Sequence, residues 1–175
     1  PVQIYESLLK NIVAEDLNNN APVSSGLPAG PGASSGLAVF SAEKAEALGK
    51  KGKRVVLIRE ETSPEDIHGM HYSEGILTSR GGLTSHAALV ARGWGKSCVV
   101  GCQDLTIDKS NKFAKIADKK IKEGDLITLN GSSGDIYLGE MKLFQNPLDN
   151  TGPLSQLLSW ADKIRKLKIR TNADT

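Results

Sequence analysis

The chain has 175 residues, with 22 Lys and Arg against 20 Asp and Glu, giving a net charge of +2. That length suits one domain of ordinary size with flanking segments, and the balanced charge argues against nucleic-acid binding by bulk charge. Aromatic residues make up only 5%, which argues against an aromatic platform for bases, and no apolar stretch reaches the roughly 20 residues of a membrane span. No N-terminal signal is present, and neither terminus resembles a natural chain end, so we expect part of a longer protein.

Strands and helices are predicted to alternate through the first hundred residues. Residues 1–20 predict a short amphipathic helix and then a polar run, while the Pro-, Gly- and Ser-rich residues 21–36 predict a loop or linker. Ser41 and Ser63 are expected helix N-caps. The expected strands are 36–40, 54–60, 75–79 and 96–102, and the expected helices are 41–52, 62–71 and 84–92.

After residue 112 the sequence changes to short runs in which apolar and polar residues alternate. The alternating runs KFAKIA, DLITLN and DIYLG are separated by KEGD and NGSSGD, which predicts hairpins. Residues 153–168 then predict an amphipathic helix. Its apolar stripe consists of Leu154, Leu157, Leu158, Ala161 and Ile164. Together the elements predict an α/β domain over 21–145, with a connector at 1–20 and a linker helix within 146–175.

The two cysteines, Cys98 and Cys102, are too few for a disulfide framework. They lie four residues apart in an apolar run, so in a strand they would share one face. We expect two buried free thiols and a reducing intracellular compartment, with the cytoplasm favoured over a plastid or another organelle.

The segment from Gly81 to Ala88, with the sequence GGLTSHAA, lies between a predicted strand and a predicted helix. The glycines Gly81 and Gly82 permit a sharp turn, and Thr84 or Ser85 is expected to cap the helix. His86 then falls in the first helical turn, where free N–H groups and the positive end of the helix dipole favour an anion such as phosphate.

A histidine in this position is suited to phosphoryl transfer. The helix dipole disfavours the imidazolium form, and a neutral imidazole has a free ring nitrogen that can attack phosphorus. The phosphohistidine formed is an anion, which the same helix terminus stabilises. A capping-region histidine is also often only a polar surface residue, and the spacing alone leaves both interpretations open.

Other interpretations of the histidines are weaker. Ser85 and His86 are sequence neighbours whose side chains point apart, which does not suit a hydrolase dyad, and no Gly-Lys-Ser/Thr completes a phosphate-binding P-loop. His68 and His71 have a helical i, i+3 spacing that suits a metal, but no further ligand completes such a site. We expect surface or packed histidines and no metal.

The run Gly81–Arg92 resembles the phosphohistidine signature of the phosphoenolpyruvate-utilising enzymes. The flanking segments DIHGM, EGILT and RGWGK are most similar to those of the pyruvate phosphate dikinases. The chain departs from that pattern at Leu83, where methionine is common, and at Ser97-Cys98, where two cysteines are expected. Both departures are conservative, and the resemblance covers roughly residues 20–145.

The resemblance implies a swivelling β/β/α phosphohistidine domain that carries phosphoryl between two partner domains of the same chain. One partner binds nucleotide, and the other is a barrel that binds phosphoenolpyruvate and pyruvate. ATP, phosphate and pyruvate would become AMP, pyrophosphate and phosphoenolpyruvate. Mg²⁺ would act in the full-length enzyme, which is expected to be a homodimer. No metal ion is expected on this fragment, and the fragment alone should not turn over.

By the same resemblance, His86 is the residue that becomes phosphorylated. Gly81, Gly82, Thr84, Ser85 and Arg92 would form the phosphate environment, and Thr84 matches a threonine that is a regulatory phosphorylation site in plant dikinases. Arg92 either contacts phosphate or serves as a cation at the helix C-terminus. Residues 20–30 and 145–153 are expected hinges. The alternatives are the carrier domain of a phosphoenolpyruvate synthase and a non-catalytic anion-binding module.

Overall fold

The computed structural model describes residues 9–108, 113–145 and 153–166, and the chain divides into two units, Pro1–Gln145 and Asn146–Thr175. The first unit is built around an eight-stranded sheet in the order β2-β12-β11-β4-β5-β6-β7-β3. Strands β4 to β7 are parallel and the others pair antiparallel. The sheet consists of β2 (Ser24–Ser25), β12 (Asp135–Leu138), β11 (Leu126–Asn130), β4 (Ala33–Val39), β5 (Val55–Arg59), β6 (Gly75–Thr78), β7 (Ser97–Val100) and β3 (Leu27–Gly30).

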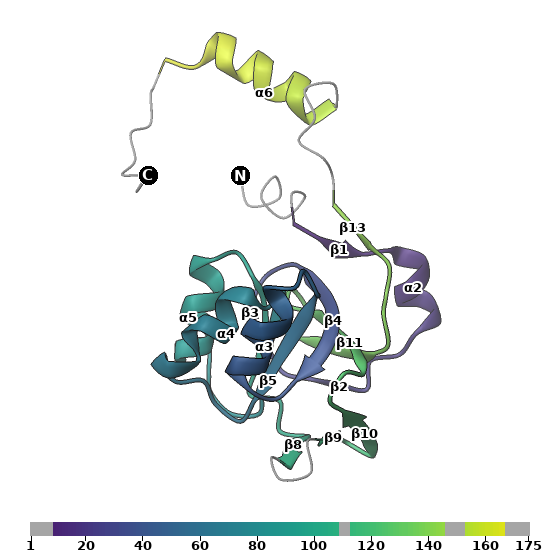
Figure 1. Ribbon diagram of the computed structural model, residues 1–175. Coiled ribbons are helices and arrows are strands. Elements are labelled where there is room, and N and C mark those ends of the chain that lie inside the picture. Colours follow the sequence, from purple (N-terminus) through teal and green to yellow (C-terminus); the bar gives the residue numbers. More distant parts are fainter. Residues whose placement is uncertain (1–8, 109–112, 146–152, 167–175) are drawn as a thin grey trace. The chain divides into compact units, whose positions relative to one another are not determined.

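One face of this sheet is covered by helices that connect its parallel strands (Figure 1). They are α3 (Ala42–Gly49), α4 (Ile67–Tyr72), which follows a 3₁₀ turn over Pro64–Asp66, and α5 (His86–Gly93). Small residues let them lie close to the sheet, as Ala45 in α3 and Ala88 in α5 are fully buried against it. The predicted cap at Ser41 is confirmed, because its side chain accepts a hydrogen bond from the N–H of Lys44 at 3.3 Å.

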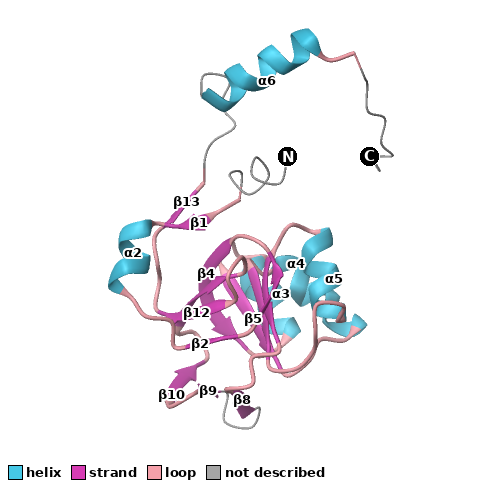
Figure 2. Ribbon diagram, turned by 180° about the vertical axis from the view of Figure 1, so that it is seen from behind, coloured by secondary structure: helices cyan, strands magenta, loops and turns pink. Residues whose placement is uncertain are grey.

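The opposite face is covered by a three-stranded antiparallel sheet, visible below the main sheet in Figure 2. Its strands are β8 (Leu105–Asp108), β9 (Phe113–Ile116) and β10 (Lys119–Lys122). Ile116 and Ile121 pack in one apolar cluster with Val56 and Leu77 of the main sheet. The predicted β/β/α layering is therefore confirmed. The predicted β11–β12 hairpin is also present, whereas β8 and β10 were not predicted.

The first and last strands of the described part of the first unit lie side by side. Strand β1 (Asn11–Ile12) pairs antiparallel with β13 (Leu143–Phe144), and α2 (Ala14–Asn19) follows β1. The helix predicted early in 1–20 lies in part outside the described residues, and within them the helix occupies the polar run instead. Asp16 anchors it by accepting a hydrogen bond from the N–H of Lys142 at 2.6 Å.

The prediction of a linker over 21–36, with a hinge at 20–30, is wrong. This segment forms β2, β3 and much of β4, and β3 pairs with β7 through Leu27 and Val100. Gly30 in this segment allows close contact between backbones, because a Cβ there would lie 2.4 Å from the carbonyl oxygen of Lys96. The other expected hinge, 145–153, lies almost entirely outside the described residues.

The second unit contains α6 (Pro153–Ile164), as predicted. Large apolar side chains among its described residues are exposed, with Leu157 at 51% and Ile164 at 77%. None of the helices within the described ranges combines the length and apolar character needed to cross a membrane.

Both cysteines are buried free thiols, as predicted, but they do not share a face. Cys98 packs with the helix-side cluster, whereas Cys102 packs in the cluster between the two sheets. The reason is Gly101, whose φ of +65° ends the alternation of β7 and turns the chain over.

We expect neither thiol to react in the folded protein. Burial raises the pKa of the Cys98 thiol to about 12 and raises that of Cys102 as well, so almost no thiolate is present near neutral pH. Iodoacetamide at pH 8, followed by mass spectrometry, should modify neither cysteine in the native protein and both after denaturation. Rapid native alkylation of Cys98 would contradict this burial.

Candidate functional site

The segment singled out in the sequence lies at the carboxyl ends of the parallel strands. We call Gly81–Ser85, between β6 and α5, the histidine loop. It is fixed at its start, because the N–H of Arg80 donates to the carbonyl of Glu60 at 2.9 Å and the Thr78 hydroxyl donates to the carbonyl of Arg80 at 2.6 Å. The loop is therefore held by the ends of two neighbouring strands, β5 and β6.

Only one of the two glycines uses a glycine-specific backbone conformation. Gly81 has a φ of +102°, which other residues rarely adopt, whereas Gly82 has open space around its Cα. A Cβ on Gly101 would lie 2.9 Å from the carbonyl oxygen of Gly81, so the turn after β7 packs directly on the loop. The loop is thus supported from a third strand.

Helix α5 begins at His86, and Ser85 rather than Thr84 is its N-cap. The Ser85 side chain accepts a hydrogen bond from the N–H of Ala88 at 3.4 Å. Thr84 is exposed, and its hydroxyl makes no hydrogen bond to another described residue. The first N–H groups of α5, those of His86 and Ala87, are free of helical partners by their position in the first turn.

The His86 ring is oriented by a residue that the sequence did not single out. Its Nδ1 lies 3.3 Å from Oγ1 of Thr62, a side chain that is only 6% exposed. His86 itself is half-buried, and within the described residues its Nε2 has no hydrogen-bond partner. The arrangement leaves Nε2 as the nitrogen available for chemistry.

Thr62 is held in place by an ion pair beneath its loop. Arg59 at the end of β5 contacts the buried Asp66 at 3.1 Å, and the carboxylate of Asp66 also accepts from the N–H of Ser63 at 2.9 Å. Arg59 donates in addition to the carbonyl of Phe40 at 3.2 Å. These contacts fix the segment 60–66, so that the Thr62 side chain is held next to the imidazole of His86.

Arg92 reaches back along α5 toward the histidine loop. Its Nε donates to the carbonyl of Ala88 at 3.2 Å, and a terminal nitrogen donates to the carbonyl of Leu83. The guanidinium therefore ties the end of the helix to the loop that precedes it.

The other two histidines lie away from this site. Both are exposed on α4, and His71 makes edge contacts with the rings of Tyr72 and Trp94, each at 5.2 Å between centroids. Among the described residues, no three His, Cys, Asp or Glu side chains are grouped as metal ligands would be.

Comparison with known proteins places this fold and site in a family. Residues 51–134 match the family model described as the mobile domain of PEP-utilising enzymes. Those residues, which include the histidine loop and α5, correspond to the mobile domain of that family.

The most similar relatives that we report are plant enzymes. The chain is 53% identical over 153 residues to the chloroplastic pyruvate, phosphate dikinase 1 of Arabidopsis thaliana, and 54% identical to the chloroplastic pyruvate, phosphate dikinase of Flaveria pringlei. Each alignment covers 87% of this chain and 16% of the relative, so the chain spans about a sixth of the relatives' length. A solution structure of Enzyme I is 25% identical, with a TM-score of 0.35 over 63% of this chain and 37% of that one.

Proposed function

We propose that this domain is the phosphoryl carrier of a pyruvate phosphate dikinase and that His86 is the residue that carries the phosphoryl group. The observation that carries this proposal is the His86 ring at the start of α5, with Nδ1 held by Thr62 at 3.3 Å and Nε2 bonded to none of the described residues. The high identity to two dikinases over 153 residues supports the same assignment.

The proposed step is a direct transfer to Nε2. The lone pair of Nε2 attacks phosphorus, an N–P bond forms, and the P–O bond to the departing group breaks. With phosphoenolpyruvate as donor, the electron pair of that P–O bond leaves on the enolate of pyruvate. Thr62 holds the Nδ1 edge, so the ring presents Nε2 without rotating.

Helix α5 is suited to stabilise the product. The phosphoryl group adds negative charge next to the first turn, where N–H groups point outward and the helix dipole is positive. The same N–H groups and the helix dipole stabilise the negative charge that develops on the phosphoryl oxygens during transfer.

The substrate sites belong, in this proposal, to a nucleotide-binding domain and a barrel elsewhere in the full-length chain. Those domains would hold Mg²⁺, which neutralises phosphate charge during transfer. We also propose a homodimeric parent enzyme in a reducing compartment, the cytoplasm or a plastid.

Labelling of the full-length enzyme tests the proposal. Incubation with phosphoenolpyruvate carrying ³²P should give an acid-labile, base-stable label, and peptide mapping should place it on His86. Label that survives acid, or that maps elsewhere, would overturn the proposed function. Dependence of the ATP half reaction on inorganic phosphate separates a dikinase from a synthase.

Thr62 is expected to contribute to the rate through the orientation of His86. Thr62→Val removes a hydrogen bond of roughly 1 kcal/mol, so kcat for phosphohistidine formation should fall about fivefold while KM changes little. Thr62→Ser keeps a hydroxyl and should restore most of the rate. A loss in Thr62→Ser with none in Thr62→Val would mean that the methyl packing of Thr62 matters, and not its bond to Nδ1.

A further inference from the structure

The small sheet β8–β10 presents an outward face that is rich in lysine. In the strand register, Lys115 of β9 lies opposite Lys120 of β10 and Thr106 of β8, and on the next rung Phe113 lies between Lys122 and Asp108. Alternation places Ile116 and Ile121 on the inner face, where they are buried. We call Phe113, Lys115, Lys120 and Lys122 the lysine face.

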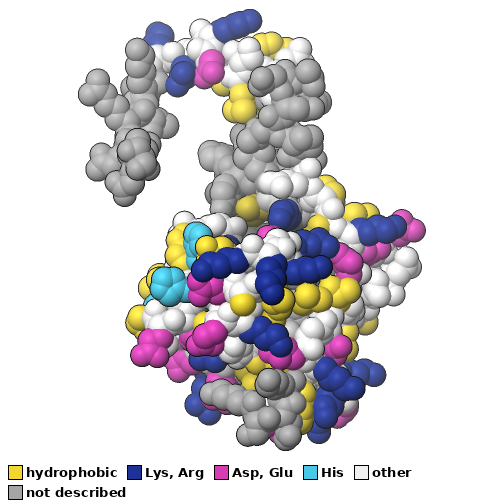
Figure 3. All heavy atoms as spheres, in the orientation of Figure 1, with side chains coloured by type: hydrophobic (Ala, Val, Ile, Leu, Met, Phe, Trp, Pro, Cys, Tyr) yellow, Lys and Arg dark blue, Asp and Glu magenta, His cyan; other side chains and the backbone are white. Residues whose placement is uncertain are grey.

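The charges of this face are not neutralised within the described residues. The ion pairs between described residues involve other cations, and Lys115, Lys120 and Lys122 are all exposed. Figure 3 shows Lys and Arg side chains gathered at the lower right of the molecule, over the region of β10. Two lysines directly opposite one another on neighbouring strands destabilise the sheet.

Protection of a sheet edge accounts for only part of this pattern. Strand β10 is at the edge of its sheet, where lysines discourage pairing with another chain. Lys115, however, lies on the central strand β9, which has a neighbour on each side. The charge of Lys115 does not protect a sheet edge, so edge protection does not explain why this lysine lies opposite Lys120.

The lysine face lies at the same end of the domain as the histidine loop. A pocket of about 260 Å³ is lined by Ser79 and Arg80, which lead into that loop, and by Thr106 and Ile107 of β8. Thr106 belongs to the outward rung that contains Lys115. The pocket therefore lies between the segment that leads into the histidine loop and the strand β8 that borders the lysine face.

The arrangement of Phe113 favours a protein partner over a nucleic acid. The ammonium of Lys120 lies 3.7 Å from the centroid of the Phe113 ring, so that ring face is already occupied and is not open for a base to stack on. A surface of carboxylates complements exposed ammonium groups without needing a free ring.

We propose that the lysine face docks against a carboxylate-rich surface that borders the phosphoryl site of a partner domain. The proposal rests on the carrier function proposed above. Its effect is to steer and align the domain as His86 enters the partner's site, since charge complementarity acts chiefly on encounter and orientation.

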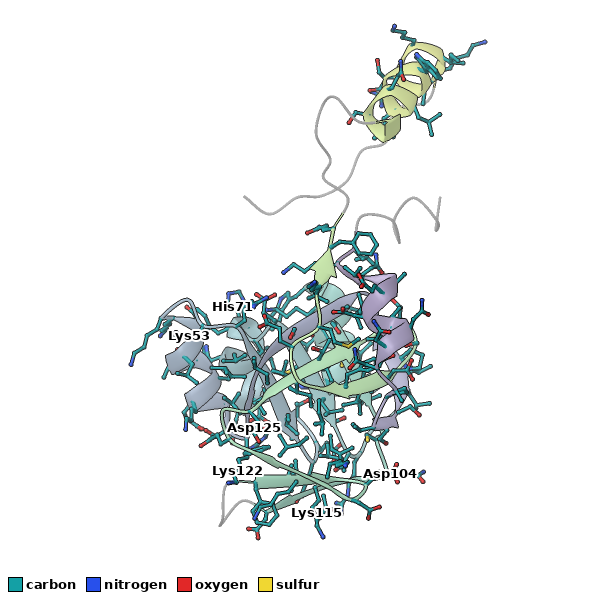
Figure 4. All side chains as sticks on the ribbon, turned by 90° about the vertical axis from the view of Figure 1, so that its right-hand side faces the viewer. Lys53, His71, Asp104, Lys115, Lys122 and Asp125 are labelled. Carbon is teal, nitrogen blue, oxygen red and sulfur yellow. The ribbon has the colours of Figure 1, made fainter. Side chains whose placement is uncertain are left out.

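A pair of double variants in the full-length enzyme tests this. Lys115→Gln/Lys120→Gln removes two charges from the lysine face, and Lys51→Gln/Lys53→Gln removes two from the turn before β5, at the other end of the parallel strands. Figure 4 shows Lys53 well away from Lys115 and Lys122. The rate of ³²P labelling is measured separately from phosphoenolpyruvate and from ATP with phosphate.

At about 10 mM salt, where charges act over roughly 30 Å, the lysine-face variant should be about tenfold slower in one half reaction, which identifies the partner. The difference should shrink to within about twofold at 1 M salt, where the Debye length is about 3 Å. The control variant should match the wild type, and Lys115→Arg/Lys120→Arg should restore the rate. Melting temperature identifies any variant that has lost its fold.

Equal rates for the two Gln double variants in both half reactions would overturn the docking role. Weakened binding of a fluorescent oligonucleotide with unchanged transfer would assign the face to nucleic acid instead, and this too would overturn the proposal. Absence of label on His86 in the wild type would refute the carrier function itself, so the two failures are distinguishable.

Discussion

Replacing His86 by asparagine is expected to abolish labelling from phosphoenolpyruvate, with a fall in rate of at least about 10⁴-fold. The amide nitrogen of asparagine has a delocalised lone pair and does not attack phosphorus. Asparagine reaches about as far as Nδ1 of the histidine, so it retains a group that can bond Thr62 and should keep the loop folded. The measurement is single-turnover labelling of the full-length enzyme, with thermal unfolding recorded in parallel.

His68→Asn is the matched control for this experiment. His68 is exposed on α4, so the substitution should leave both labelling and stability unchanged. Label on His86→Asn would remove His86 from the chemistry, and loss of label in His68→Asn as well would show that the effect is not specific to His86.

The local part of the site could be predicted from sequence because its signals lie close together in the chain. A strand, a glycine with positive φ, a capping serine and a helix follow one another within residues 75–93, and each is fixed by neighbours only a few positions away. The sequence could not decide whether Thr84 or Ser85 caps the helix, because both residue types are good N-caps.

Thr62 was missed for the opposite reason. It is 24 residues from His86 in the sequence, and no local pattern marks it as a partner of the imidazole. The parallel pairing of β5 with β6 brings the two segments to one edge of the sheet. Only the tertiary fold carries this information.

The failed linker prediction shows how composition can mislead. Pro28 lies on β3, at the edge of the sheet, where the missing N–H costs little. Gly36 sits in β4 because a Cβ there would lie 2.8 Å from the backbone of Arg54. These residues favour loops in isolation, but here they permit strands to pack tightly.

A negative charge at Thr84 is expected to inhibit phosphoryl transfer. Thr84 lies two residues before His86, at the mouth of the same helix, and its side chain is exposed. Two unit charges about 7 Å apart at an effective dielectric constant near 20 repel by about 2.4 kcal/mol, so Thr84→Asp should slow labelling about fiftyfold. Phosphorylation, which adds roughly −1.5 to −2 charges, should inhibit more strongly.

Because Ser85 caps α5, this effect can be separated from helix stability. Thr84→Asp leaves the hydrogen bond between the Ser85 side chain and the N–H of Ala88 in place, so the melting temperature should not fall. Thr84→Asn is the uncharged match for the aspartate and should label at close to the wild-type rate. An equal loss in the two variants would show that the shape of the side chain, and not its charge, controls access to Nε2. A deficit confined to Thr84→Asp and reduced by salt would instead identify repulsion at the helix terminus, the same charge preference that makes this position suitable for a phosphohistidine.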